Sequence, residues 1–179
     1  FDGHNFLEKA IQKGASGVIV SCKDSALKYN GLFVKNTRAA LINFAEFSRN
    51  RFKGKTIGIT GSNGKTTTKE LIAHILHCSY RISFTKENYN STIGMPMSLF
   101  AIKKSDEIFI AEIGTNKKGE IKYLSDIAKP DMALITNISE SHLSNLINLN
   151  GVFEEKINLF KALPQLSLIH ISEPTRLLA

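Results

Sequence analysis

Residues 56–69 read Thr-Ile-Gly-Ile-Thr-Gly-Ser-Asn-Gly-Lys-Thr-Thr-Thr-Lys, and this stretch predicts the fold more clearly than any other part of the chain. Residues 56–60 are mostly apolar or β-branched, which favours a buried strand. The strand pattern breaks at Gly61 and Gly64, and apolar positions with helical spacing follow. The predicted apolar face of that helix consists of Leu71, Ile72, Ile75 and Leu76. The stretch therefore predicts a strand, a glycine loop and a helix.

A glycine loop between a strand and a helix is suited to phosphate oxygens. The loop turns backbone N–H groups inward, and the helix N-terminus adds its positive dipole end. The motif is Gly-x-x-Gly-Lys-Thr, because Ile59 stands where the longer P-loop pattern has its first glycine. Lys65 would reach the terminal phosphates, and the Thr66 hydroxyl would bind Mg²⁺. The expected nucleotide-binding residues in the loop are Gly61, Ser62, Asn63, Gly64, Lys65, Thr66 and Thr67.

Composition and charge narrow the class of protein. Of the 179 residues, 42% are apolar and 22% are charged, as in an ordinary globular protein. No apolar run approaches the roughly 20 residues that span a bilayer, and no signal peptide is visible. The net charge is +7, but the lysines are scattered, so we expect no nucleic-acid partner. Two distant cysteines without a C-x-x-C motif indicate a reduced, cytoplasmic protein.

The order of patterns along the chain predicts two α/β parts. Residues 1–35 suggest a small α/β piece, and residues 37–52 suggest a connecting helix. A larger unit follows, with predicted buried strands at Thr56–Thr60, Ile108–Ile113 and Met132–Ile138. Apolar strands that alternate with helices indicate a mostly parallel sheet covered on both faces. The expected class is therefore α/β, with a P-loop-type sheet of about three strands preceded by part of a smaller domain.

Polar residues that follow the predicted strands are candidates for the site, because ligands bind beyond the carboxyl ends of parallel strands. Glu112 ends the second strand and could hold Mg²⁺, or it could belong to a buried ion pair. His142 follows the third strand and would share a rim with Lys65 and Glu112, although a lone histidine is often structural. The polar loop at residues 88–96 is either a capped surface loop or a substrate contact. Its candidate contacts are Asn88, Asn90, Ser91 and Thr92.

Four stretches together resemble the Mur ligase family, ATP-dependent enzymes that form amide bonds in peptidoglycan synthesis. They are Phe-Asp-Gly-His-Asn-Phe at 1–6, the loop at 58–68, Ala-Glu-Ile-Gly-Thr-Asn at 111–116 with Gly-Glu-Ile at 119–121, and Thr-Asn-Ile at 136–138 with His-Leu at 142–143. The first and third stretches and the loop at 88–96 most resemble the member that adds D-alanyl-D-alanine. The resemblance implies ATP and Mg²⁺ as cofactors, and UDP-N-acetylmuramoyl-tripeptide and D-alanyl-D-alanine as substrates.

The resemblance also implies roles for single residues. Lys65 is the phosphate-binding lysine, Asn137 contributes to nucleotide binding, and Thr66, Glu112 and His142 are magnesium ligands. Lys156 aligns with a lysine that many members carry as a carbamate, an anionic oxygen ligand suited to a second Mg²⁺. The alternative for Lys156 is a solvated helix lysine. The chain departs from the pattern at Ser91, where a second asparagine is common, and at residues 139–141, where Ser-Glu-Ser replaces Gly-x-Ala.

The resemblance suggests a division of the chain into three parts. Residues 1–52 would be part of the UDP-substrate-binding N-terminal domain with its connecting helix, and residues 53–163 part of the central ATP-binding domain. Residues 164–179 fit no pattern of the family and resemble translated sequencing-adapter sequence, so we expect an artefactual tail. The missing initial Met suggests that the sequence begins inside a longer protein. We expect the ligase to be a monomer. The rival hypotheses are a related ligase that adds another amino acid, a folate or cyanophycin relative, and a nucleotide-binding fragment without catalysis.

Overall fold

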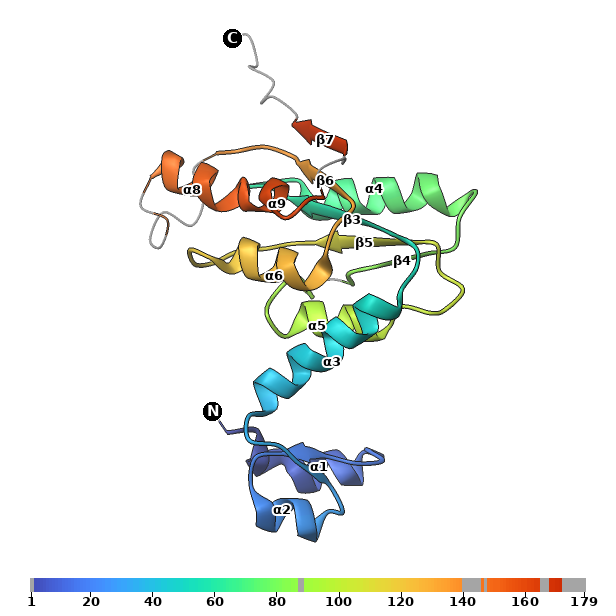
Figure 1. Cartoon of the computed structure of the whole chain (residues 1–179), viewed down its shortest axis with the longest axis vertical. Helices are drawn as coiled ribbons and strands as arrows, with labels where there is room; N and C mark the ends of the chain where they lie inside the picture. The colour runs from blue at the N-terminus through green and yellow to red at the C-terminus, as the bar shows by residue number, and fades with distance from the viewer. Residues whose placement is uncertain (1, 87–88, 140–145, 147, 165–167, 172–179) are drawn as a thin grey trace. The chain divides into compact units, whose positions relative to one another are not determined.

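The computed structural model describes residues 2–86, 89–139, 146, 148–164 and the backbone of 168–171. The chain divides into two compact units, Phe1–Phe44 and Ala45–Ala179 (Figure 1). Their boundary falls inside α3 (Thr37–Arg51), the connecting helix that the sequence predicts. The assignment of domain roles to these parts stays a prediction.

The first unit is a small α/β piece, as expected. It contains η1 (Gly3–Phe6), α1 (Leu7–Gln12), β1 (Ile19–Val20), α2 (Lys23–Lys28) and β2 (Leu32–Phe33), and the two strands pair in parallel. The Asp2 carboxylate accepts a hydrogen bond from the His4 N–H at 3.0 Å and caps η1. The ring nitrogen Nε2 of His4 accepts a hydrogen bond from the backbone N–H of Ser21 at 3.1 Å. The Asp-Gly-His motif thus ties the start of the chain to the end of β1.

The second unit is built on a parallel sheet with the strand order β4-β5-β3-β6-β7. The strands are β3 (Lys55–Thr60), β4 (Ile82–Phe84), β5 (Ile108–Glu112), β6 (Met132–Ile135) and β7 (Leu168–Ile171). The parallel sheet is confirmed, and β3 is its central strand. The expected number of about three strands is wrong, because β4 pairs with β5 and β7 pairs with β6. Strand β4 was not predicted because its three residues are too few to show a periodic pattern.

Helices cover both faces of this sheet. Helix α4 (Lys65–His77) contacts β3, β4 and β5 and packs on the face that carries Ile57 and Ile59. A side chain at Gly58 would run into Leu159, so α9 (Asn158–Lys161) covers the opposite face. Helix α6 (Glu120–Ala128) lies beside α9 and also contacts β3. Helices α5 (Gly94–Phe100) and α8 (Leu149–Lys156) both contact α6.

The predicted apolar face of α4 is wrong in part. Leu71 and Ile75 are 59% and 68% exposed, whereas Lys69 and Ala73 are buried and Ile72 and Leu76 pack against the core. Positions 69, 72, 73 and 76 follow the i, i+3, i+4, i+7 spacing of one helix face. This face is hard to recognise in the sequence because Lys69 interrupts its apolar pattern.

Two further features concern the environment of the protein. Cys22 and Cys78 are both free and exposed. Among the described residues, no helix combines the length and the apolar character needed to cross a membrane.

Candidate functional site

The glycine loop lies between the end of β3 and the start of α4, as predicted. Gly61 has φ 155° and Gly64 has φ 76°, both in the region that favours glycine. A side chain at Gly61 would also collide with the Thr136 hydroxyl. The ammonium of Lys65 is half-buried and donates to the carbonyl oxygens of Gly61, at 2.8 Å, and Ser62, at 3.3 Å. Lys65 therefore folds back over the loop that it follows.

The loop is held by the segment that follows β6. The Ser62 N–H donates to the Asn137 carbonyl oxygen, and the Asn63 N–H donates to Asn137 Oδ1, both at 3.0 Å. The Thr136 hydroxyl donates to the Asn63 carbonyl oxygen at 2.6 Å. Ser62 also exchanges hydrogen bonds with Ser139. The structure thus shows Asn137 in contact with the loop backbone, and it adds Ser139, which the sequence analysis recorded only as a departure from the family pattern.

Glu112 lies at the end of β5, beside the first turn of α4. Its Oε1 accepts hydrogen bonds from the Thr66 hydroxyl and from Asn90 Nδ2, both at 3.1 Å. Its Oε2 lies 3.4 Å from the ammonium of Lys69. Glu112 therefore joins a buried ion pair and also contacts Thr66, the predicted magnesium ligand. These contacts are compatible with both of the roles considered for Glu112. The sequence analysis missed Lys69, although a lysine within an apolar helix face is a signal that could have identified it.

Lys156 is not a solvated lysine, because only 1% of it is exposed. The pKa of Lys156 is lowered from 10.5 to about 8, mainly by burial and also by the positive charge of Lys65. The carboxylate of Glu155 acts in the opposite direction. Its neighbour Glu155 accepts hydrogen bonds from the Gly119 N–H at 2.7 Å and from the Ile121 N–H at 2.8 Å. Glu155 thus caps the N-terminus of α6 and fixes the turn of α8 that carries Lys156.

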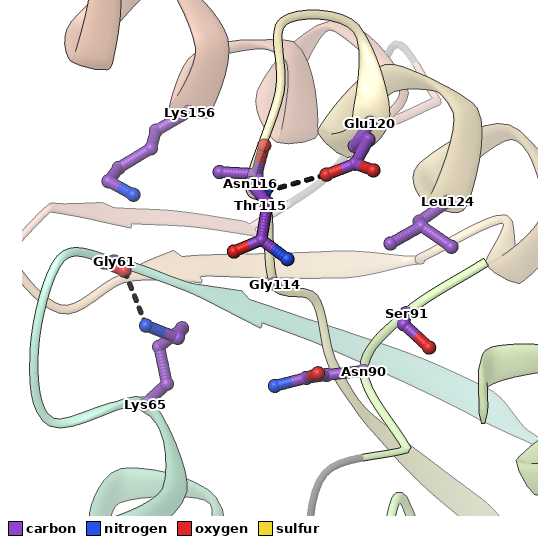
Figure 2. Close-up of a pocket in the computed structure, with 10 residues that line it drawn as sticks. All are labelled: Gly61, Lys65, Asn90, Ser91, Gly114, Thr115, Asn116, Glu120, Leu124 and Lys156. Atoms are coloured by element: carbon purple, nitrogen blue, oxygen red, sulfur yellow. Dashed lines mark hydrogen bonds between the residues drawn. The ribbon is translucent and has the colours of Figure 1, made fainter. Parts of the chain in front are cut away.

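A pocket of about 160 Å³ joins these elements (Figure 2). Figure 2 shows Lys65 from α4 and Lys156 from α8 pointing into it from opposite sides. The predicted residues that line it are Gly61, Lys65, Asn90, Ser91 and Lys156. The lining residues that were not predicted are Gly114, Thr115, Asn116, Glu120 and Leu124. Most of these follow β5, and their position beyond the end of a strand is a signal that could have identified them together with Glu112.

The electrostatics of the pocket favour an anion. Burial lowers the pKa of Lys65, while the neighbouring carboxylate of Glu112 acts in the opposite direction. Two lysine side chains thus meet in one pocket, and the Glu120 carboxylate that also lines it accepts from the N–H groups of Asn116, at 2.6 Å, and Lys117, at 3.0 Å. Phosphate oxygens would match this arrangement.

Some of the predicted contacts are not brought into the pocket. Thr92 is half-buried in the turn before α5 and does not line it, while the Ser91 hydroxyl accepts a hydrogen bond from the Gly94 N–H at 3.3 Å. Ser91 therefore also caps the turn, as the alternative interpretation expects. Asn88 and His142 lie outside the described residues, and their roles stay predictions.

The residues present fit a hard divalent cation. The Thr66 hydroxyl and the Glu112 carboxylate are adjacent oxygen groups, of the kind that Mg²⁺ prefers. Within the described part of the chain, no group of three or more His, Cys, Asp or Glu residues could hold a metal ion by itself. Thr66 and Glu112 would supply part of a coordination shell, an arrangement that suits a Mg²⁺ ion shared with substrate phosphates.

Comparison with known proteins identifies relatives with this architecture. The chain is similar to the UDP-N-acetylmuramoyl-tripeptide--D-alanyl-D-alanine ligase of Bacillus subtilis (strain 168), with 38% identity over 92% of this chain and 36% of the relative. The corresponding ligase of Haemophilus influenzae is 35% identical over 91% of the chain and 36% of the relative. The chain thus spans about 36% of the length of these curated relatives.

Solved structures of MurF ligases also match this chain. Crystal structure I of MurF from Acinetobacter baumannii matches with a TM-score of 0.88 and 31% identity, over 97% of this chain and 39% of that one. MurF ligase from Thermotoga maritima in complex with ADP matches with a TM-score of 0.82 and 29% identity, over 96% and 40%. The family model of the Mur ligase middle domain matches residues 59–177, so the match extends into the predicted tail. The match covers most of the chain, and the chain belongs to the Mur ligase family.

Proposed function

We propose that this chain is the nucleotide-binding part of an ATP-dependent ligase that joins D-alanyl-D-alanine to UDP-N-acetylmuramoyl-tripeptide. The observation that carries the proposal is the pocket in which Lys65 and the buried Lys156 face each other beside the glycine loop. The names of the relatives support the two substrates. The ADP complex of the Thermotoga maritima structure supports ATP as the nucleotide.

The proposed reaction transfers a phosphoryl group and then forms an amide. A carboxylate oxygen of the tripeptide attacks the γ-phosphorus of ATP, the bond to the β–γ bridging oxygen breaks, and ADP leaves. The amine of D-alanyl-D-alanine then attacks the carbonyl carbon of the acyl phosphate. A tetrahedral species forms, the amine loses a proton, and phosphate leaves. Both steps place negative charge close to the pocket.

The residues of the chain would stabilise that charge. Lys65 would exchange its contacts with the loop carbonyls for the γ-phosphate oxygens, and preorganised cations of this kind are a large part of phosphoryl-transfer catalysis. Thr66 and Glu112 would hold Mg²⁺, with His142 as a further ligand. The metal would neutralise phosphate charge. Asn90, hydrogen-bonded to Glu112, would orient this carboxylate and contact the substrate.

Lys156 would act as a carbamate. Its buried amine has a pKa of about 8, so the neutral, nucleophilic form is a minority near neutral pH but far more abundant than for an exposed lysine. The nitrogen would attack CO₂, a C–N bond would form, and one proton would leave to solvent. The product is an anionic oxygen ligand for a second Mg²⁺. The low exposure of Lys156 would shield this carbamate from water.

The test uses a chimera, because the chain spans about 36% of its relatives. In the chimera, this chain replaces the matching segment of the Bacillus subtilis ligase. We expect phosphate release from ATP that requires both UDP-N-acetylmuramoyl-tripeptide and D-alanyl-D-alanine. ATP hydrolysis with another amino acid in place of the dipeptide would favour a different ligase. ATP binding without substrate-dependent hydrolysis would favour a nucleotide-binding module.

The compartment and the oligomeric state belong to the same proposal. We place the reaction in the cytoplasm, where ATP is available and where the free Cys22 and Cys78 would stay reduced. We expect a monomer without a nucleic-acid partner, and light scattering of the chimera would test the monomer.

A further inference from the structure

Lys69 is a fully buried lysine on α4, with none of its surface exposed. Its ammonium donates to the Thr85 carbonyl oxygen at 2.7 Å and lies 3.4 Å from Glu112 Oε2. It also lies 3.2 Å from Glu70 Oε1, but Glu70 is about half exposed. Buried lysines are rare and need a partner of opposite charge. Glu112 is the buried partner.

Thr85, directly after β4, fixes both members of this pair. Its carbonyl oxygen accepts from Lys69, and its hydroxyl accepts from the Glu112 N–H at 2.9 Å. The pair is therefore held by α4, β5 and the end of β4 together. This framework positions Lys69 whether or not a nucleotide is bound.

The two carboxylate oxygens of Glu112 face different groups. Oε1 accepts from Thr66 and Asn90, on the side of the glycine loop. Oε2 accepts no hydrogen bond among the described residues, and the ammonium of Lys69 is the charge beside it. A metal at Thr66 would therefore contact Oε1, while the charge of Lys69 partly neutralises the same carboxylate from the side of Oε2.

The charges around Glu112 oppose the binding of a free cation. Lys65 adds positive charge on the pocket side, and so does Lys156 before a carbamate forms. The carboxylates of Glu120 and Glu155 both accept hydrogen bonds from backbone N–H groups. Without CO₂ and nucleotide, positive charge therefore predominates in this region. A triphosphate would reverse this balance by adding several negative charges.

We propose that Lys69 is a counter-ion that makes metal binding at Thr66 and Glu112 depend on nucleotide. Lys69 lowers the affinity of this carboxylate for a free divalent cation, so the metal is held only when phosphate oxygens complete its shell. This inference rests on the proposed function, because it takes Thr66 and Glu112 as the metal ligands. It assigns to Lys69 a role that a purely structural buried lysine would not have.

The test measures binding of Mn²⁺ alone to the 179-residue chain, by the loss of the free-ion EPR signal, without nucleotide. Lys69→Met removes the charge, and Lys69→Gln removes it while keeping a donor for the Thr85 carbonyl. We expect both variants to bind Mn²⁺ about 10-fold more tightly than the original chain, since a cation beside the ligand is lost. Lys69→Arg keeps the charge and should bind Mn²⁺ as weakly as the original chain. Lys104→Gln removes an exposed lysine distant from the loop in sequence, and as the matched control it should leave Mn²⁺ binding unchanged.

A double variant, Lys69→Met with Glu112→Gln, locates the gained site and should lose the extra Mn²⁺ affinity. Unchanged or weaker Mn²⁺ binding in the neutral variants would overturn the inference, as would a gain that persists in the double variant. If Lys69→Met does not fold, as judged by circular dichroism, Lys69→Gln decides. Calorimetry with a non-hydrolysable ATP analogue tests the proposed function separately. Failure to bind that analogue would refute the proposed function, while the Mn²⁺ comparison would still decide the role of Lys69.

Discussion

The hydroxyl of Ser62 donates to the Ser139 carbonyl oxygen at 2.8 Å and accepts from the Ser139 N–H at 2.9 Å. This reciprocal pair joins the glycine loop to the segment after β6. With the contacts of Asn137, it sets the position of the loop before any phosphate is bound. The shape of the phosphate site therefore depends on residues more than 70 positions apart in the sequence.

We predict that Ser62→Ala loosens the loop. The loss of two hydrogen bonds should lower the free energy of unfolding by about 1–2 kcal/mol, measured by urea denaturation. Affinity for ATP should also fall, since a mobile loop must be ordered on binding. Ser79→Ala, at the exposed end of α4, is the control and should change neither quantity. Equal ATP affinity in both variants would show that the Ser139 contact does not shape the phosphate site.

Lys65→Ala in the chimera should reduce ligation at least on the order of 100-fold, because one preorganised charge on the γ-phosphate is lost. The melting temperature should change little, since Lys65 is half-buried and its hydrogen bonds to the loop carbonyls can be replaced by water. Lys104→Ala, at an exposed lysine distant from the loop in sequence, serves as the control for loss of positive charge. Near-normal turnover of Lys65→Ala would refute its assignment to the phosphate site.

Glu112→Gln should raise the Mg²⁺ concentration that the chimera needs for half-maximal activity, because an amide is a weaker metal ligand than a carboxylate. The glutamine oxygen could still accept from Thr66, but Lys69 would lose its buried partner charge, so the free energy of unfolding should also fall. His142→Ala tests the third predicted ligand in the same titration. Glu107→Gln removes a surface carboxylate that pairs with Arg81 and is the control. Identical magnesium titrations for Glu112→Gln, His142→Ala and the control would exclude the shared metal site.

Burial of Lys156 should make stability depend on pH. Its folded pKa is about 8, below the 10.5 of an exposed lysine. Between these values the unfolded chain binds a proton that the folded chain does not, so stability should rise with pH. Relative to Lys156→Met, the free energy of unfolding of the original chain should increase from about pH 8 to about pH 10.5. Parallel curves for the two proteins would contradict the lowered pKa.

The carbamate of Lys156 can be detected directly. Incubation of the chain with ¹³C-bicarbonate should give a carbamate NMR signal that grows as pH rises through about 8, because only the neutral amine reacts. The signal should be absent in Lys156→Ala. In the chimera, Lys156→Ala should have low activity that acetate or formate partly restores. Full activity of that variant without added carboxylate would show that Lys156 takes no part in the reaction.

We expect the 179-residue chain by itself to form no amide bond. The chain spans about 36% of the length of its curated relatives, and the remaining part of a ligase would be needed to exclude water from the acyl phosphate. The chain should still bind ATP through the glycine loop, so calorimetry and ligation assays should give different answers. Product formed from ATP, UDP-N-acetylmuramoyl-tripeptide and D-alanyl-D-alanine by the purified chain would refute this expectation.

The sequence alone determined the strand, glycine loop and helix that begin at Thr56, the parallel sheet and the family. Local patterns carry these features, because strand periodicity, a glycine loop and a lysine at a helix start are encoded by neighbouring residues. It also indicated Lys65, Glu112 and Lys156, since each belongs to a motif. It failed at β4 and on the buried face of α4, where three residues are too few for a pattern and a lysine interrupts the apolar spacing.

Only the tertiary structure decided which of these groups meet. Lys69 pairs with Glu112 across 43 positions, and Ser62 meets Ser139, because parallel strands bring distant segments to the same edge of the sheet. The altered pKa of Lys156 likewise arises from burial and from the charge of Lys65, which lies on another helix. Burial and charge at a side chain depend on the whole packed unit, so no local stretch of sequence could reveal them.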